Sequence, residues 1–122
     1  MRVWVAAGAV VACLAVAAGA FGAHALKGRL DPERLAIFET AVRYAFYHAF
    51  GLMIAGIVAG EERSLRWAGW SFLAGVVLFS GTLAVLALTG WRWLGALTPF
   101  GGILFMIGWL FLAWGVMKKR PA

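Results

Sequence analysis

Long apolar stretches alternate with short polar ones along this chain, and four of the stretches are long enough to cross a membrane. A helix rises about 1.5 Å per residue, so about 20 apolar residues cross a hydrocarbon core about 30 Å thick. The pattern predicts an all-α fold, a four-transmembrane-helix bundle of antiparallel, up-down topology. We expect one domain, residues 1–122, with helices near 3–26, 32–60, 65–89 and 98–118.

Local signals set where the helices begin. Asp31 is placed to cap the second helix and Pro32 to occupy its first position. A helix over 32–60 is about 43 Å long, more than the core needs, so we expect it to enter the membrane near Ala41. Thr98 and Pro99 predict the start of the fourth helix in the same way. One longer helix kinked at Pro99 is the alternative.

The first apolar segment also has features of a secretory signal. Arg2 precedes it, and Ala23-His24-Ala25 resembles a cleavage site. The residues around Cys13 resemble a lipoprotein box, but they come after only a short apolar run. The whole run is longer than the apolar part of a signal peptide, and three further segments follow, so we predict a retained helix.

Composition places the chain in lipid. Hydrophobic residues make up 64% of it and charged residues 13%, against about 45–50% and 25% in soluble domains. The net charge of +6 comes from residues at the ends of apolar segments, where they meet lipid headgroups, so we expect membrane lipids and not nucleic acid as partners. Lys and Arg divide six against five between the two sides. The cluster at 118–120 favours cytoplasmic termini in the cell inner or plasma membrane.

Small residues recur at helix-packing spacing. Gly101, Gly108 and Gly115 repeat every seven residues, and Ala15, Gly19 and Ala23 every four. In lipid, small residues let helix backbones approach closely. The glycines expected at contacts are Gly19, Gly22, Gly75, Gly81, Gly101, Gly102, Gly108 and Gly115. Packing within one bundle is the simpler interpretation, and a homo-oligomer is the alternative.

Polar side chains form a stripe on the second helix. Thr40, Tyr44 and His48 are spaced by four, and Glu39, Arg43 and Tyr47 repeat the spacing one residue earlier, so the two rows lie side by side. His48 falls about 10 Å below Ala41. On the opposite face, we expect Leu35 and Val42 to meet lipid or lightly packed surface.

Antiparallel threading brings further polar residues to the same end. The resulting candidate polar pocket, in one leaflet's half, comprises His24, Lys27, Thr40, Arg43, Tyr44, His48, Ser80, Thr82 and Thr98. Such groups usually face the bundle interior and mark function. Each also has a simpler interpretation: His48 as a neutral core histidine, Glu39 and Arg43 as a surface ion pair, and the hydroxyls as partners of local backbone.

At these residues the chain resembles the YgdD-like family of small membrane proteins, which includes the animal transmembrane protein 256 group. The motifs are GAFGAHAL at 19–26, FETA at 38–41, FSGTL at 79–83 and TPFGG at 98–102. Ala45 and Ala84 depart from the family, which commonly has Gln and Tyr there, so this pocket should be less polar. The resemblance implies a membrane location and this fold. Since the family carries a label of unknown function, it implies no activity.

Several functions fit these features. A non-enzymatic membrane protein that binds a lipid, small ligand or partner through the polar pocket fits best, and a small homo-oligomeric transporter or channel is the alternative. Small multidrug transporters need a carboxylate deep in helix one, which this chain lacks. A redox or metal protein using His24 and His48 is a third reading, but no carboxylate or thiolate accompanies them. No nucleophile–base pair or phosphate loop is evident, so we expect no enzyme, metal or cofactor.

Overall fold

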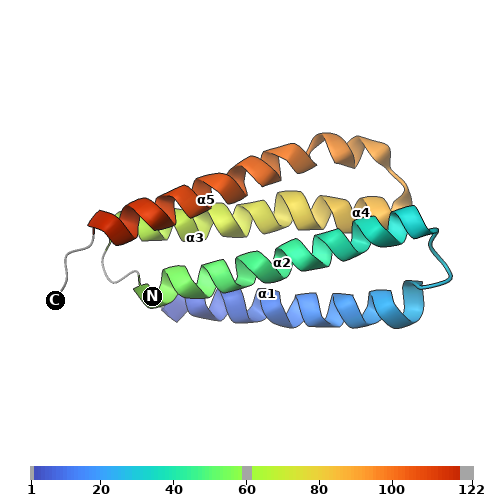
Figure 1. Cartoon of the computed structure of the whole chain (residues 1–122), viewed down its shortest axis with the longest axis horizontal. Helices are drawn as coiled ribbons and strands as arrows, with labels where there is room; N and C mark the ends of the chain where they lie inside the picture. Colours follow the sequence, from blue (N-terminus) through green and yellow to red (C-terminus); the bar gives the residue numbers. More distant parts are fainter. Residues whose placement is uncertain (1, 59–61, 119–122) are drawn as a thin grey trace.

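The computed structural model describes residues 2–58 and 62–118, which are almost entirely helical. Helices long and apolar enough to cross a membrane cover Arg2–Leu26, Pro32–Val58, Arg63–Thr89 and Arg92–Lys118. They run up and down in turn (Figure 1), so the predicted fold of four transmembrane helices is confirmed. The predicted end of the second helix, Gly60, lies outside the described residues.

Three of the spans change helix type along their length. The first consists of α1 (Arg2–Phe21) and a π-helical turn, η1 (Gly22–Leu26), and the second is α2 (Pro32–Val58) alone. The third contains α3 (Arg63–Gly75), a second π-helical turn, η2 (Val76–Gly81), and α4 (Thr82–Thr89). The fourth opens with a 3₁₀ turn, η3 (Arg92–Ala96), and continues as α5 (Thr98–Lys118). The sequence did not predict the π turns.

A polar side chain caps the start of α2, but the residue predicted to cap α5 has its hydroxyl engaged elsewhere. The backbone N–H of Arg34 donates to Asp31 Oδ1 at 2.8 Å, so Asp31 caps α2 as predicted. In contrast, Thr98 is not an N-cap, because the chain already turns helically through η3 and the Thr98 hydroxyl donates to the Leu94 carbonyl at 3.3 Å. The predicted helix start is confirmed, since α5 begins at Thr98, and only the predicted capping role of Thr98 is wrong.

The helices pack in chain order. The most extensive contacts join α1 to α2 and α3 to α5, and α2 joins the two pairs by packing on α3, η2 and α4. In the part of the chain that the structure describes, α1 and α5 make no substantial contact. Figure 1 accordingly shows α1 and α5 on opposite sides of the molecule. Gly90, with φ of +77°, ends α4 in the left-handed conformation that favours glycine.

Glycines make the close contacts between the helices. A methyl group added at Gly108 would lie 2.6 Å from the Phe72 ring, one at Gly115 would lie 2.7 Å from Leu65, and one at Gly101 would overlap the backbone of Phe79. All three glycines are buried. The seven-residue glycine row is thus used within one chain, where it seats α5 on α3 and η2.

The other expected glycines divide into close and open positions. A methyl group would overlap the Phe105 ring at Gly75 and lie 3.0 Å from Phe38 at Gly22. At Gly19 the nearest atom would be 3.5 Å away, and at Gly81 and Gly102 it would be 3.9 Å away, an ordinary contact or more.

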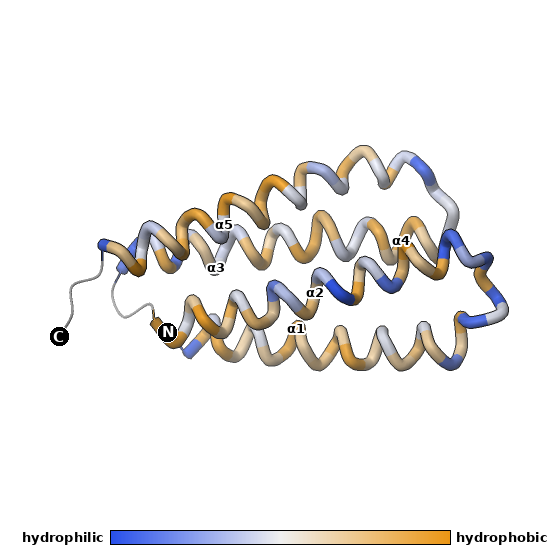
Figure 2. Tube along the Cα trace, in the orientation of Figure 1, coloured by the Kyte–Doolittle hydropathy of each residue, from blue (hydrophilic) through white to orange (hydrophobic). Residues whose placement is uncertain are grey.

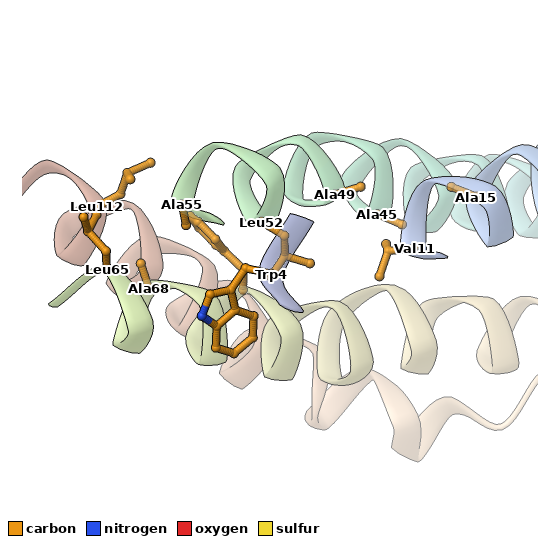
Figure 3. Close-up of a cluster of buried hydrophobic side chains, with 11 residues drawn as sticks. Trp4, Val11, Ala15, Ala45, Ala49, Leu52, Ala55, Leu65, Ala68 and Leu112 are labelled. Carbon is orange, nitrogen blue, oxygen red and sulfur yellow. The ribbon is translucent and has the colours of Figure 1, made fainter. Parts of the chain in front are cut away.

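Two close contacts were missed from the sequence. A methyl group at Gly8 of α1 would lie 2.6 Å from the Ala49 carbonyl of α2. A methyl group added at Gly69 of α3 would lie 2.5 Å from the Trp4 ring, and Figure 3 shows the Trp4 side chain in a cluster of buried hydrophobic side chains.

The apolar face of α2 packs against α1. Leu35 and Val42 are half-buried against the core clusters, and Phe38, Ala45 and Ala49 on the same face are buried. The expectation that Leu35 and Val42 meet lipid or lightly packed surface is therefore wrong. Because α2 lies between α1 and the third span, two of its faces are covered.

Candidate functional site

His48 is held from both sides of its ring. The side chain is 4% exposed; its Nδ1 lies 2.7 Å from the Tyr44 carbonyl, and the indole Nε1 of Trp109 lies 3.0 Å from Nε2. An indole nitrogen only donates, so Nε2 accepts and the proton sits on Nδ1, which donates to Tyr44. The imidazole is therefore neutral with both nitrogens satisfied.

Aromatic rings enclose this imidazole. Phe105 stacks on it with centroids 3.5 Å apart and planes 5° from parallel, and Phe72 lies at 5.6 Å. Tyr44, His48, Phe105 and Trp109 line an outer groove of about 420 Å³ between α2 and α5. Hydrogen bonding and stacking thus make His48 a link between the second and fourth spans.

The arrangement bears on the metal hypothesis. His48 could bind an ion only by giving up the Trp109 hydrogen bond, and no cluster of three or more metal-binding side chains occurs among the described residues. His24 is exposed in η1, at the Pro32 end of the molecule. His48 lies sixteen residues beyond Pro32, about 24 Å along α2, so the two histidines do not form one site.

Hydroxyl groups join the third span to the fourth. Thr82 Oγ1 lies 2.6 Å from the Leu78 carbonyl and 2.8 Å from Thr98 Oγ1. Thr82 follows directly after η2, and a π turn leaves such carbonyls available to a side chain. Thr82 is 8% exposed, and its hydroxyl forms a hydrogen bond with that of Thr98 inside the bundle.

Ser80 has no such partner. Its side chain is 6% exposed, and no described group hydrogen-bonds to its buried hydroxyl. It lines a cleft of about 340 Å³ between α1, α2 and the third span, whose other walls are apolar. Small side chains leave this space: Ala15, Ala18, Ala41, Ala45 and Ala84. Two of these, Ala45 and Ala84, are the positions expected to make a pocket here less polar. We call this space the Ser80 cleft.

The remaining predicted residues lie on the surface near the α1–α2 turn. Lys27 and Arg43 are exposed, and Thr40 donates to the Ala36 carbonyl at 3.0 Å. No ion pair joins Glu39 to Arg43; among described residues the ion pair is Lys118 with Glu62, at 3.5 Å. The predicted Glu39–Arg43 pair is therefore corrected: at an exposed position, such a pair gains little over hydration.

The predicted polar residues thus form separate local groups. The structure brings together Tyr44 with His48 and Thr82 with Thr98, places Ser80 in the cleft, and leaves His24, Lys27 and Arg43 exposed. Figure 2 shows the hydrophilic positions of α2 in its half nearer Pro32.

Sequence reasoning missed two functional contacts. The first is Trp109, which sits in mid-helix and not with the Trp residues at segment ends; an indole N–H at that depth needs an acceptor, and this signal was available. The second is Arg34, whose Nε donates to the Ala87 carbonyl at 2.8 Å. From the sequence, Arg34 is one of the charged residues at the ends of apolar segments, and nothing local indicates its partner.

The comparisons with known proteins agree with this architecture. The model of the family described as "Protein of unknown function (DUF423)" matches residues 18–102. A UPF0382 membrane protein of Staphylococcus epidermidis is 47% identical over 97% of this chain and 98% of its own. The UPF0382 membrane protein YwdK of Bacillus subtilis is 42% identical, with the same coverage. No solved structure matches. The chain is a multi-pass membrane protein, and it belongs to the DUF423 family, whose relatives here are named UPF0382 membrane proteins.

Proposed function

We propose that this protein is a non-enzymatic lipid-binding protein of the membrane, and that the Ser80 cleft holds part of an apolar lipid chain. The observation that carries the proposal is the buried, unpartnered Ser80 hydroxyl in an otherwise apolar cleft. The cleft's volume of about 340 Å³ falls at the lower end of the range for small-molecule sites, about 300–1,000 Å³. That size suits a segment of an acyl or isoprenoid chain.

Water is a poor alternative occupant. A buried water needs about two to four polar partners, and among the residues lining the cleft Ser80 supplies the one polar side chain. A lipid chain fills the apolar remainder, and an ester or hydroxyl oxygen near its head would satisfy Ser80. The protein therefore binds and orients the lipid, and it makes or breaks no covalent bond.

Cross-linking tests the proposal. The protein is reconstituted with a phospholipid that carries a diazirine in its acyl chain, then illuminated, digested and analysed by mass spectrometry. We expect labelled peptides from 76–84 and from the facing part of α1. Ala84→Tyr fills the cleft and should remove most of the label at 76–84.

The matched control is Ala17→Tyr, since Ala17 is an exposed residue of α1 outside the cleft. This variant should label like the wild type. The proposal fails if folded Ala84→Tyr labels at 76–84 as strongly as the wild type, or if the wild type labels there no more than on its outer surface. Ser80→Ala should still bind a lipid chain in the cleft, but its preference for lipids with an oxygen near the head should be weaker than that of the wild type.

A further inference from the structure

Arg43 is a cation without a counter-charge in a membrane-spanning helix. It lies eleven residues beyond Pro32 in α2, which has 27 residues. Its side chain is exposed, and no described residue hydrogen-bonds or ion-pairs with it. An ionised group within a span is costly unless it finds a partner or reaches water, and such residues mark function more often than chance.

The guanidinium stands beside a groove. The space, about 410 Å³, lies between the end of the first span and α2. Gly19, Gly22 and Ala23 form one wall, and Phe38, Val42 and Phe46 of α2 form the other. Glu39 and Arg43 supply its polar side chains. We call it the Arg43 groove.

Helix geometry directs Arg43 toward the membrane surface. Its Cα lies about 17 Å along the axis from Pro32, and α2, at about 40 Å, is longer than a core of about 30 Å. Side chains on a helix lean toward its N-terminus, here the nearer end. Arg43 can therefore extend from the apolar part of the groove to the level of lipid phosphates.

Charged residues of both signs surround the groove, and the cation among its lining residues is Arg43. Lys27 and Arg29 are exposed in the turn at this end, and Arg34 is engaged with the Ala87 carbonyl. The acidic side chains here are Asp31, which caps α2, and the exposed Glu33 and Glu39. Glu39 lies within the groove without pairing with Arg43, so the guanidinium donors stay available to a ligand.

We propose that the Arg43 groove binds an anionic phospholipid, with the phosphate on the Arg43 guanidinium and one acyl chain along the Phe38 and Phe46 wall. Guanidinium and phosphate match in charge and in paired hydrogen-bond geometry. This groove adjoins the Ser80 cleft, since Phe38 and Val42 line both spaces, but Ser80 lines only the cleft and Arg43 only the groove.

Native mass spectrometry from detergent tests the site. Wild type is titrated with phosphatidylglycerol and phosphatidylcholine of equal chain length, and we expect phosphatidylglycerol to bind preferentially. Arg43→Gln should weaken phosphatidylglycerol binding about tenfold, the loss of one charge-assisted contact. Arg43→Lys, which keeps the charge without the paired geometry, should lie between. Arg29→Gln, an equal charge change in the exposed turn, should bind nearly as the wild type does.

Three results would overturn the site. They are equal losses in Arg43→Gln and Arg29→Gln, no lipid preference in the wild type, or displacement of phosphatidylglycerol by millimolar inorganic phosphate, which would indicate a free-anion site. If Arg43→Gln does not fold, Arg43→Lys and cross-linking of diazirine-labelled phosphatidylglycerol to 19–23 decide the matter. Ala84→Tyr should leave the lipid preference intact, so this site and the Ser80 cleft can fail independently.

Discussion

His48 shows how a buried polar side chain is made compatible with a lipid-solvated bundle. It uses its single proton on the Tyr44 carbonyl and its lone pair on Trp109, while Phe105 covers its face. The helical spacing on α2 drew attention to this residue. Its partner could not be read from the sequence, because pairing His48 with Trp109 depends on the register of α2 against α5, which local pattern does not encode.

Removing His48 should therefore destabilise the bundle. His48→Ala leaves the Trp109 N–H without an acceptor and a void beside Phe105, and we expect a loss of about 2–3 kcal/mol in the free energy of unfolding. The measurement is unfolding in mixed micelles of dodecyl maltoside and SDS. Trp109→Phe alone should also be destabilising, since it strands Nε2. The double variant His48→Ala/Trp109→Phe should lose less than the sum of the two single variants. Strict additivity would mean that the hydrogen bond contributes nothing.

Glu62 gives the molecule a pH dependence outside the membrane. The backbone N–H of Ser64 donates to its carboxylate at 3.3 Å and Lys118 lies at 3.5 Å, and in that order these lower the pKa of Glu62. A carboxyl whose pKa is lowered by folding adds stability above its unfolded pKa, and this is lost as pH falls through the folded value. We expect the protection of amides in the first turn of α3 against exchange, corrected for the intrinsic exchange rate at each pH, to fall on acidification below the ordinary pKa of Glu. Glu62→Gln should flatten that response, and an unchanged profile would exclude Glu62 as its source.

At the scale of the element, the spacing of the glycines indicated a close-packing face on a helix. It did not indicate which helix packs against that face. The row at 101, 108 and 115 indicates that α5 has a close-packing face, and the structure places that face on α3 and η2. Whether such a row serves one chain or joins two depends on which helix is nearest, which spacing leaves open. The π turns are a second example, because no local residue pattern predicts where η1 and η2 interrupt the α-helical spans.

Substitution on α5 separates buried from open glycines. Gly108→Ala would place a methyl group 2.6 Å from Phe72, so we expect a loss of about 1–3 kcal/mol from overpacking. Gly102→Ala is the matched control: its methyl would lie 3.9 Å from Phe79, and Ala favours helix over Gly. Its stability should be unchanged or slightly raised in the same micelle assay. If both variants lose equally, backbone flexibility and not close packing explains Gly108.

Arg34 ties the start of α2 to the end of α4. Its Nε–H donates to the Ala87 carbonyl, one of the last in α4, where a cation also meets the negative end of the helix. Arg34→Ala should cost about 1.5–3 kcal/mol, the usual range for a hydrogen bond to a charged group. Glu33→Ala, next to it and exposed, is the control and should unfold like the wild type. Equal midpoints for all three proteins would mean that the Arg34 bond is not formed in solution.

At the scale of the whole molecule, the bilayer makes the number of spans predictable and the packing order much less so. A helix satisfies its own backbone in lipid and needs about 20 apolar residues to cross the core, so hydropathy and the cap at Asp31 predicted the four spans. In lipid, however, inward and outward faces are both apolar. The pattern of α2 therefore could not show that Leu35 and Val42 pack against a core cluster, nor that α1 and α5 stay apart.

Disulfide trapping tests the packing order in which α1 and α5 do not contact each other. In a Cys13→Ser background, Gly19→Cys with Val42→Cys should close rapidly within one chain, because a Cβ at Gly19 lies 3.5 Å from Val42. Ala6→Cys with Ala113→Cys joins exposed positions at matching depth in α1 and α5. Because α1 and α5 make no substantial contact, this pair should form no bond within the chain under the same oxidant. Non-reducing gels and peptide mapping distinguish the products. A bond within the chain between 6 and 113 would mean that the four helices close into a ring. A dimer linked through the same pair would instead show that these two free edges meet between copies, as the homo-oligomer alternative requires.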